Sequence, residues 1–310
     1  MIITVTVNPA MDRTLEIANL FGGGLNIVNA SQLDAGGKGI NVSKTIRRLG
    51  GKAVATGLLG GETGVQIRRR LDHMDIPHDF VDVAGETRTN IKVFDAASQK
   101  TTEFNELGPA LTLDDLSRLM VKLETLIIPG SIVVLSGSVP KTLPNDTYAR
   151  LITCVHVCKG MVFLDASGQV FKEAVAAQPD MIKPNRHELE GYFGKAMQTE
   201  ADYIEAGQHF LSLGIKQIVF SLGNEGAYYI NEKAIFRLKP LKVETQSSVG
   251  AGDAFVGAFV YGMTNGDSTE DILRLALATS AGAVTTKGTQ PAAWAWINSH
   301  LKDVCIDRLR

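Results

Sequence analysis

One acidic residue, Asp253, directly follows three small residues in the segment SSVGAGDAFVGAFVYG, residues 247–262. The residues after it have the apolar spacing of a helix, which places Gly250, Ala251 and Gly252 at the helix N-terminus, where backbone N–H groups lack partners. Such amides, together with the positive end of the helix dipole, bind anions. An aspartate in a first turn is also common in helices that bind nothing, since the same dipole favours it. The segment alone therefore leaves an anion site and an ordinary helix start open.

A second glycine-rich segment, DAGGKGINVSKTIRRLG, spans residues 34–50. Within it, Lys38 offers a positive charge and Asn41 an amide from the first turn of the helix that follows. The close approach of a ligand to the backbone is permitted by three glycines, Gly36, Gly37 and Gly39. A plain turn between a strand and a helix, with a solvated lysine, explains this segment equally well when it is taken alone.

A third segment, MIKPNRHELEGYFG, carries Asn185 and Glu188 three positions apart. At the start of a helix both side chains face the same side, where they could hold a hydrated Mg²⁺ ion. The same spacing is typical of a helix N-cap with its capping partner.

A fourth segment, SLGNEGAYYI, contains Ser221, Gly223 and Gly226. These residues are suited to a turn between two strands, and ordinary hairpin chemistry accounts for them.

Short apolar runs recur along the chain, as strands buried on both faces require. Amphipathic segments separate most of them, and one of these begins at Thr112, which has capping-box spacing to Asp115. This alternation predicts an α/β fold with a doubly wound, mainly parallel sheet between two helical layers, a three-layer αβα arrangement. The predicted strands are residues 2–8, 53–60, 131–138, 161–167, 181–185 and 217–223.

Two segments, residues 13–34 and 84–107, break this alternation. Each shows the strand-like alternation of apolar and polar residues, with no helix between the strands. We expect the two segments to pair in a small β-sheet beside the main one, where they would form a lid over a site. Residues 1–310 are then expected to form one domain.

The overall charge excludes two classes of partner. The 310 residues carry a formal net charge of -2, which gives no electrostatic basis for binding nucleic acid or an anionic membrane. The odd number of cysteines, three, is typical of a reducing compartment. No apolar run reaches the roughly 18 residues of a membrane span, and the N-terminus reads as a strand. We therefore expect the protein in the cytoplasm.

Taken together and in this order, the segments resemble the PfkB family of ribokinase-like sugar kinases. The resemblance runs from NPAMD near the start to the helices after Asp253, and both glycine-rich segments match the paired signatures of the family. It implies a three-layer α/β kinase fold with a small β-sheet lid. Within the family, the segments NPAMD, AGGKGIN, GETRTNIKV, SGSVP and KPNRHELE look most like 1-phosphofructokinase and tagatose-6-phosphate kinase.

The resemblance also implies roles for individual residues. Asp253 is the expected catalytic base, and the amides of residues 250–253 are expected to stabilise the transferring phosphoryl group. The sugar hydroxyls are expected to be bound by Asp12, Gly37 and Asn41, next to Gly36, with Lys38 and Arg88 near the substrate phosphate. The ATP site is expected to be lined by Lys183, Asn185, Ser221, Gly223, Gly226, Gly250 and Gly252, with Glu188 and Asn185 ordering Mg²⁺.

Arg88 bears most directly on the substrate. A guanidinium matches phosphate oxygens, and in a lid strand Arg88 would face Thr89 and Asn90, which are further donors. A solvated strand arginine is the alternative. The resemblance implies phosphoryl transfer from ATP to a primary hydroxyl of a ketohexose monophosphate, most simply fructose 1-phosphate.

The sequence is also compatible with three other functions. They are a tagatose-6-phosphate kinase, a kinase of an unphosphorylated sugar or nucleoside, and a non-catalytic sensor of sugar phosphate or nucleotide. A homodimer formed through the lid is also expected, because an exposed small sheet favours a partner.

Overall fold

The computed structural model describes residues 1–247, 249–286 and 288–310. Two sheets organise the chain, one of ten strands and one of four. In the larger sheet the strands from β5 to β11 run parallel, and the strands from β11 to β14 are antiparallel. In spatial order they are β14 (Ile306–Arg308), β13 (Ile235–Leu238), β12 (Ala227–Asn231), β11 (Gln217–Ser221), β10 (Met181–Ile182), β9 (Met161–Asp165), β8 (Ile132–Ser136), β1 (Ile2–Thr6), β4 (Ala53–Leu59) and β5 (Val81–Asp82).

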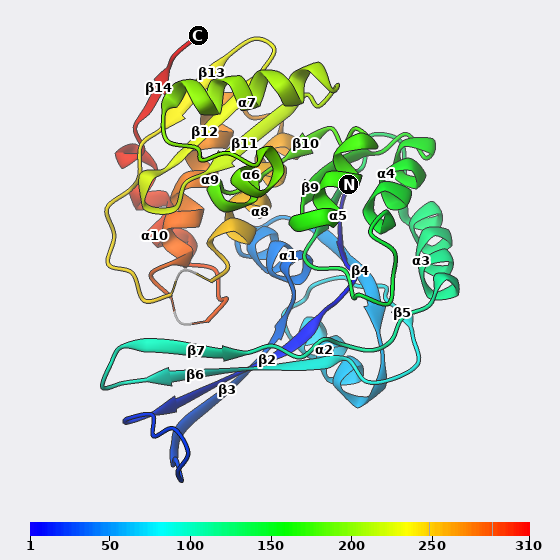
Figure 1. Ribbon diagram of the computed structural model, residues 1–310, viewed down its shortest axis with the longest axis vertical. Helices are drawn as coiled ribbons and strands as arrows, with labels where there is room; N and C mark the ends of the chain where they lie inside the picture. The colour runs from blue at the N-terminus through cyan, green and yellow to red at the C-terminus, as the bar shows by residue number, and fades with distance from the viewer. Residues whose placement is uncertain (248, 287) are drawn as a thin grey trace.

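Helices cover both faces of the larger sheet, so the predicted three-layer α/β architecture is confirmed (Figure 1). One face carries α3 (Leu113–Leu126), α4 (Thr147–Val157), α5 (Gly168–Ala176), α6 (Arg186–Phe193) and α7 (Glu200–Ser212). The other face carries α1 (Lys38–Arg48), α8 (Ala251–Asn265), α9 (Thr269–Ala283) and α10 (Trp294–His300). No helix in the described ranges is long and apolar enough to cross a membrane.

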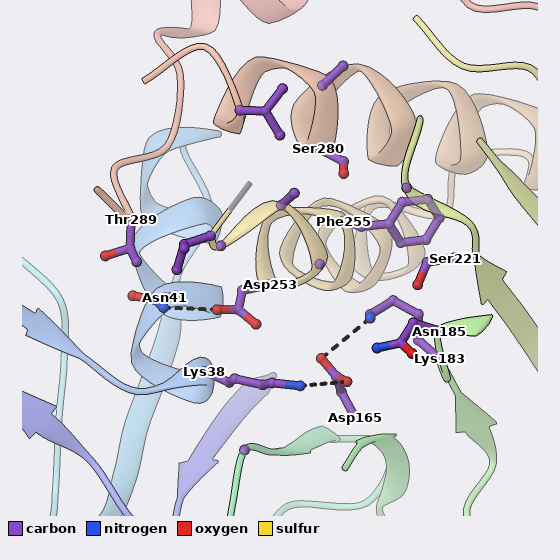
Figure 2. Close-up of a pocket in the computed structure, with 18 of the residues that line it drawn as sticks. Lys38, Asn41, Asp165, Lys183, Asn185, Ser221, Asp253, Phe255, Ser280 and Thr289 are labelled. Atoms are coloured by element: carbon purple, nitrogen blue, oxygen red, sulfur yellow. Dashed lines mark hydrogen bonds and ion pairs between the residues drawn. The ribbon is translucent and has the colours of Figure 1, made fainter. Parts of the chain in front are cut away.

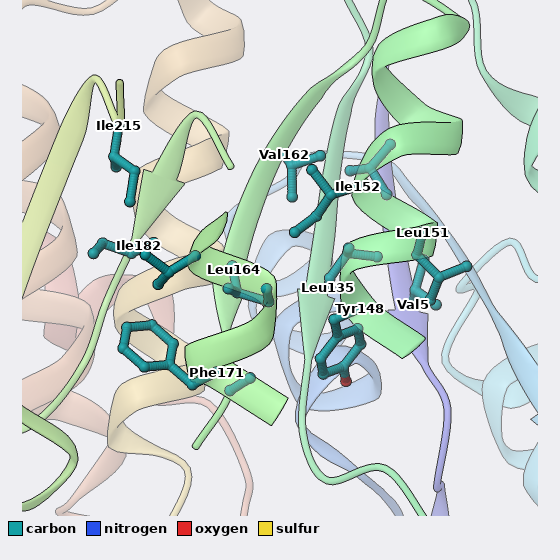
Figure 3. Packing of buried hydrophobic residues seen from close by; sticks show 14 of the residues in the cluster. Val5, Leu135, Tyr148, Leu151, Ile152, Val162, Leu164, Phe171, Ile182 and Ile215 are labelled. Atoms are coloured by element: carbon teal, nitrogen blue, oxygen red, sulfur yellow. The ribbon is translucent and has the colours of Figure 1, made fainter. Parts of the chain in front are cut away.

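The central strands are apolar at most positions because both of their faces are buried. Leu135 of β8 and Leu164 of β9 pack on the side of α4 and α5, in a cluster with Leu151 and Phe171 (Figure 3). Neighbouring strand residues point the other way; Phe163, for example, meets Phe259 of α8 edge-on, with the ring centroids 5.7 Å apart. Hydrophobic clusters on both faces therefore hold the sheet rigidly between its helical layers.

Local sequence signals also set the ends of helices. Thr112 and Asp115 form the predicted capping box at the start of α3. Asp253 lies in the first turn of α8, as expected, and the N-cap Gly250 has a φ of 85°, which an L side chain adopts only with strain. Gly250 is therefore required by the backbone conformation at the start of α8.

The smaller sheet extends away from the main layers as a separate flap (Figure 1). Its order is β3 (Val28–Gly36), β2 (Ala10–Ile17), β6 (Arg88–Asp95) and β7 (Lys100–Phe104). The strands thus extend beyond the segment 13–34 at both ends. Helix α2 (Gly61–His73) packs under the first residues of β2 and buries them, which hides the polar–apolar alternation there.

Candidate active site

A cavity of about 1010 Å³ lies where the carboxyl ends of the central strands meet the small sheet. This is the edge of an open α/β sheet at which ligands bind. It is lined by most of the residues predicted from the sequence: Asp12, Gly37, Lys38, Asn41, Arg88, Lys183, Asn185, Ser221, Gly223, Gly226, Gly250, Ala251, Gly252 and Asp253. Gly36 and Glu188 lie just outside the lining.

Asp253 is buried at the start of α8, with 6% of its surface exposed. Its Oδ2 accepts a hydrogen bond of 2.9 Å from Asn41 Nδ2, and Figure 2 shows the two side chains pointing toward one another. Burial raises the pKa of Asp253 to about 6, against the opposing effect of the Lys38 charge. The carboxylate is therefore ionised at neutral pH but holds a proton more strongly than an exposed aspartate does.

A second buried acid, Asp165, lies at the end of β9 between two lysines. Lys38 Nζ is 3.1 Å from its Oδ1 and Lys183 Nζ is 3.6 Å from its Oδ2, so that both side chains converge on it (Figure 2). Burial by itself would raise the pKa of Asp165, but Lys183 and Lys38 lower it below its usual value. In turn, Asp165 raises the pKa of Lys38 well above its usual value. The two lysines predicted for different subsites are thus joined by one carboxylate.

Sequence reasoning missed Asp165. The available signal was its position at the carboxyl end of the buried run MVFLD, which places a polar residue at the ligand-binding edge of a parallel sheet.

A third buried acid, Asp12, lies in β2 of the small sheet. It accepts hydrogen bonds of 3.0 Å from Asn90 Nδ2 and of 3.0 Å from Lys92 Nζ, both from the neighbouring strand β6. The residue at position 36 must be glycine to leave room for Asp12, because a Cβ there would lie 2.6 Å from Asp12 Oδ2. Lys92 was also missed from the sequence, although Arg88, Asn90 and Lys92 follow one another at two-residue spacing, which places all three on one face of a strand.

Arg88 begins β6 and lines the cavity. Its guanidinium donates hydrogen bonds to the backbone carbonyls of Asn8, Pro9 and Glu106, at 2.9, 3.4 and 3.1 Å. Of the five N–H groups of the guanidinium, three have these partners among the described residues, which leaves two for a ligand. The expectation that Thr89 faces the same way was wrong, because successive strand residues point to opposite faces and Thr89 lies outside the lining.

Asn185 and Glu188 form a reciprocal capping box at the start of α6. Each accepts a hydrogen bond of 2.9 Å from the backbone N–H of the other. The alternative reading of this pair, as a helix cap, is thus realised in the structure. Burial raises the pKa of Glu188. In the described ranges, no group of three His, Cys, Asp or Glu side chains is arranged to hold a metal ion by itself.

The turn between β11 and β12 shapes the far side of the cavity. Ser221, Gly223 and Gly226 form the expected connection between two antiparallel strands. Gly226 has a φ of 89°, and a Cβ there would lie 2.1 Å from the carbonyl oxygen of Leu238. Beyond the turn the wall is mainly apolar and suits a flat base, a feature that the sequence did not reveal; it includes Leu241, Val243, Val249, Ala281 and Val284.

Comparisons with known proteins agree with this geometry. Residues 6–296 match the model of the pfkB family carbohydrate kinases. The chain is 35% identical to the 1-phosphofructokinase of Borreliella burgdorferi, covering 92% of this chain and 91% of that protein. It is 31% identical to the 1-phosphofructokinase of Bacillus subtilis over 100% of both chains.

A solved structure shares the fold over nearly the whole length. Phosphofructokinase-2 from Escherichia coli in complex with substrates and products superposes with a TM-score of 0.92 at 29% identity, covering 97% of this chain and 98% of that one. A family match of this extent, together with relatives above 30% identity over nine-tenths of the chain, establishes the family. The chain belongs to the pfkB family of carbohydrate kinases, which transfer a phosphoryl group from ATP.

Proposed function

We propose that this kinase transfers the γ-phosphoryl group of ATP to the free primary hydroxyl of fructose 1-phosphate, giving fructose 1,6-bisphosphate. One observation carries the proposal. Three buried carboxylates line the cavity, and among the described residues Asp12 and Asp165 form ion pairs with lysines whereas Asp253 forms none. The similarity to 1-phosphofructokinases over nine-tenths or more of the chain supports the choice of acceptor.

Asp253 is the general base of the proposed reaction. A base needs a pKa near the working pH, and burial without a paired cation raises the pKa of this carboxyl to about 6. Its Oδ2 is fixed by Asn41, so the other oxygen can face the hydroxyl of the acceptor. As the hydroxyl oxygen bonds to the γ-phosphorus, the bond from that phosphorus to the β–γ bridging oxygen breaks and ADP leaves. The hydroxyl proton passes to Asp253.

The start of α8 stabilises the charge of the transferring group. Ala251 and Gly252 are the first two residues of the helix, and their N–H groups have no partner within it. We place the γ-phosphoryl oxygens against these amides, where the helix dipole adds to the attraction. On the acceptor side of the cavity, Lys38 provides a cation and Arg88 has two remaining N–H groups for the substrate phosphate.

Mg²⁺ is part of the proposal, and the residues present fit it. Asp165 Oδ2 is buried without a hydrogen bond, and Asn185 lines the cavity with Glu188 beside it. These are oxygen ligands of the kind that Mg²⁺ prefers, too few to enclose the ion, as expected for a metal that arrives with nucleotide phosphates. Asn185 and Glu188 would hold it, in part through water. When bound, Mg²⁺ supplies charge neutralisation for the triphosphate.

We further propose that the small sheet is the lid of a single kinase domain and the interface of a homodimer. The sheet and the loop that joins β2 to β3 expose large apolar side chains that a monomer would leave in water: Leu20, Phe21, Leu25, Ile27, Val28 and Phe104. Light scattering of the purified protein tests this proposal, with Ile27→Glu as the variant and Val157→Glu, an equally exposed position on α4, as the control. We expect a dimer that only the lid variant dissociates; a monomeric wild type would refute the interface.

We also place the protein in the cytoplasm. The chain has three free cysteines, which suit the reducing compartment in which ATP is available.

The proposed function is tested by measuring ADP release from Mg-ATP with four acceptors: fructose 1-phosphate, tagatose 6-phosphate, fructose 6-phosphate and free ribose. Asp253→Asn serves as the control. We expect fructose 1-phosphate to give the highest kcat/KM and the variant to lower turnover by roughly 10²- to 10⁴-fold. A higher kcat/KM for tagatose 6-phosphate would change the acceptor within the same class. Turnover on ribose alone would remove the role of Arg88, and ATP binding without any turnover would favour the sensor.

A further inference from the structure

Lys92 is a buried lysine for which the phosphoryl-transfer chemistry assigns no task. It lies on β6 with 7% of its surface exposed, and it lines the cavity. Its Nζ is 3.0 Å from Oδ2 of Asp12, which is 6% exposed on the neighbouring strand β2. A lysine is buried to this degree only when a partner compensates the loss of hydration.

The pair is not needed to hold the two strands together. All eight residues of β2 pair in register with β6, from Ala10 opposite Arg88 to Ile17 opposite Asp95. Lys92 lies opposite Thr14 in this register, so its side chain reaches back along the strand to Asp12. The contact therefore serves the carboxylate more than the sheet.

Asp12 needs such a partner because of what the cavity must bind. A buried carboxylate without a cation either takes up a proton or repels a second anion nearby. The proposed acceptor carries a phosphate, and the donor carries three more. The carboxylate oxygens of Asp12 are also the acceptors to which a sugar hydroxyl can donate a hydrogen bond.

The buried acids of the cavity follow a consistent pattern. Asp165, which takes no part in the proposed proton transfer, is paired with Lys38 and Lys183. Asp253, which takes the proton, is fixed by the neutral amide of Asn41 instead. Asp12 has both kinds of partner, the amide of Asn90 and the ammonium of Lys92, and so belongs with the acids whose charge is neutralised.

We propose that Lys92 is a positioning residue that neutralises the charge of Asp12 and holds its carboxylate toward the sugar, and so allows the cavity to bind a phosphorylated acceptor. The inference rests on the proposed function, since it assumes that a sugar phosphate occupies the end of the cavity beside Asp12. It assigns to a lid strand a part in acceptor recognition that is distinct from phosphate binding by Arg88.

The test is a double-mutant cycle over Lys92→Met and Asp12→Asn, with KM for fructose 1-phosphate as the main readout. We expect Lys92→Met to raise this KM at least about tenfold, the loss expected for one charge-assisted contact, and to change kcat and the KM for ATP by less than about threefold. Lys92→Arg should restore the KM to within about threefold. The double variant should be no worse than the poorer single variant, because both changes disable the same carboxylate.

Controls separate this role from a structural one. Lys100→Met removes an exposed lysine from the neighbouring strand β7 and should change nothing. Lys92→Gln, which keeps a donor, replaces the methionine variant if that variant fails to fold. An unchanged KM, penalties that add in the double variant, or a fall in kcat that arginine does not restore would each overturn the inference. Failure of the proposed function appears separately, as absent turnover of fructose 1-phosphate by the unaltered enzyme.

Discussion

Asn41 donates a hydrogen bond of 2.9 Å to Asp253 across a separation of 212 residues in the chain. The contact joins the first turns of α1 and α8, the two helices that follow the glycine-rich segments. It orients the acid toward the cavity without neutralising it, since an amide carries no charge. Replacements in these two turns should therefore separate catalysis from folding.

Asp253→Asn should make the protein more stable at neutral pH while removing activity. The folded-state pKa of about 6 lies above the usual value of 3.8, so ionisation opposes folding as pH rises through 6. The two-unit difference lowers the unfolding free energy of the wild type by roughly 3 kcal/mol above about pH 7. Below about pH 4 this loss of stability is absent. Asparagine keeps an acceptor for Asn41 and does not ionise.

Urea denaturation of both proteins at pH 4 and pH 8 measures this difference. The variant should exceed the wild type in unfolding free energy at pH 8 and match it at pH 4. Equal stability at both values would show that the Asp253 carboxyl titrates like an exposed one.

Asp165→Asn should destabilise the fold by roughly 3–5 kcal/mol, because it leaves Lys183 buried without a counter-charge. A matched control is Asp75→Asn, which removes the exposed ion pair of Asp75 with Arg47 and should cost less than about 1 kcal/mol. Chemical denaturation at pH 7 compares the two variants. Similar losses in both would contradict the role given to the buried lysines.

Gly36→Ala should impair binding of the acceptor more than it impairs folding. A Cβ at this position would lie 2.6 Å from Oδ2 of Asp12, and the carboxylate, as the end of a side chain, can move aside. Moving it breaks the contacts with Asn90 and Lys92, so we expect KM for the sugar phosphate to rise about tenfold or more.

Gly191→Ala provides the comparison for this glycine. No atom lies within 4 Å of a Cβ at Gly191, which is inside α6, so alanine should add up to about 1 kcal/mol of stability with unchanged kinetics. If Gly36→Ala proves kinetically as silent as Gly191→Ala, the close fit between Gly36 and Asp12 has no part in acceptor binding.

The layers of the fold were predictable because their signals are local. Buried parallel strands are apolar at most positions, and helix starts such as Thr112 with Asp115 carry their own capping residues. The ends of the small sheet were less predictable. Burial of Met11 beneath α2 is a tertiary contact, and it removes the alternation by which an exposed strand is recognised.

The candidate site was predictable where backbone geometry requires a particular residue. Gly250 and Gly37 have positive φ angles. Glycine is favoured at such positions, so they can be recognised in a sequence. Asp165 and Lys92 were not found, although their positions in the strands placed them near the site. The sequence does not show which lysine pairs with which acid, because the fold brings these side chains together from distant segments. For Asn185 and Glu188 the sequence left two alternatives, a Mg²⁺ site and a helix cap. The structure shows that the two capping hydrogen bonds form.

The pH dependence of kcat, measured at saturating ATP and fructose 1-phosphate for the wild type and for Asp253→Asn, tests the central claim most directly. We expect log kcat of the wild type to fall with unit slope below a pH near 6, as Asp253 takes up a proton. The kcat of the variant should be lower by roughly 10²- to 10⁴-fold and should not fall with decreasing pH near 6. Because both proteins use the same substrates, titration of the substrates cannot account for this difference. A variant within about tenfold of the wild type, or one that keeps the fall in kcat near pH 6, would show that Asp253 is not the base.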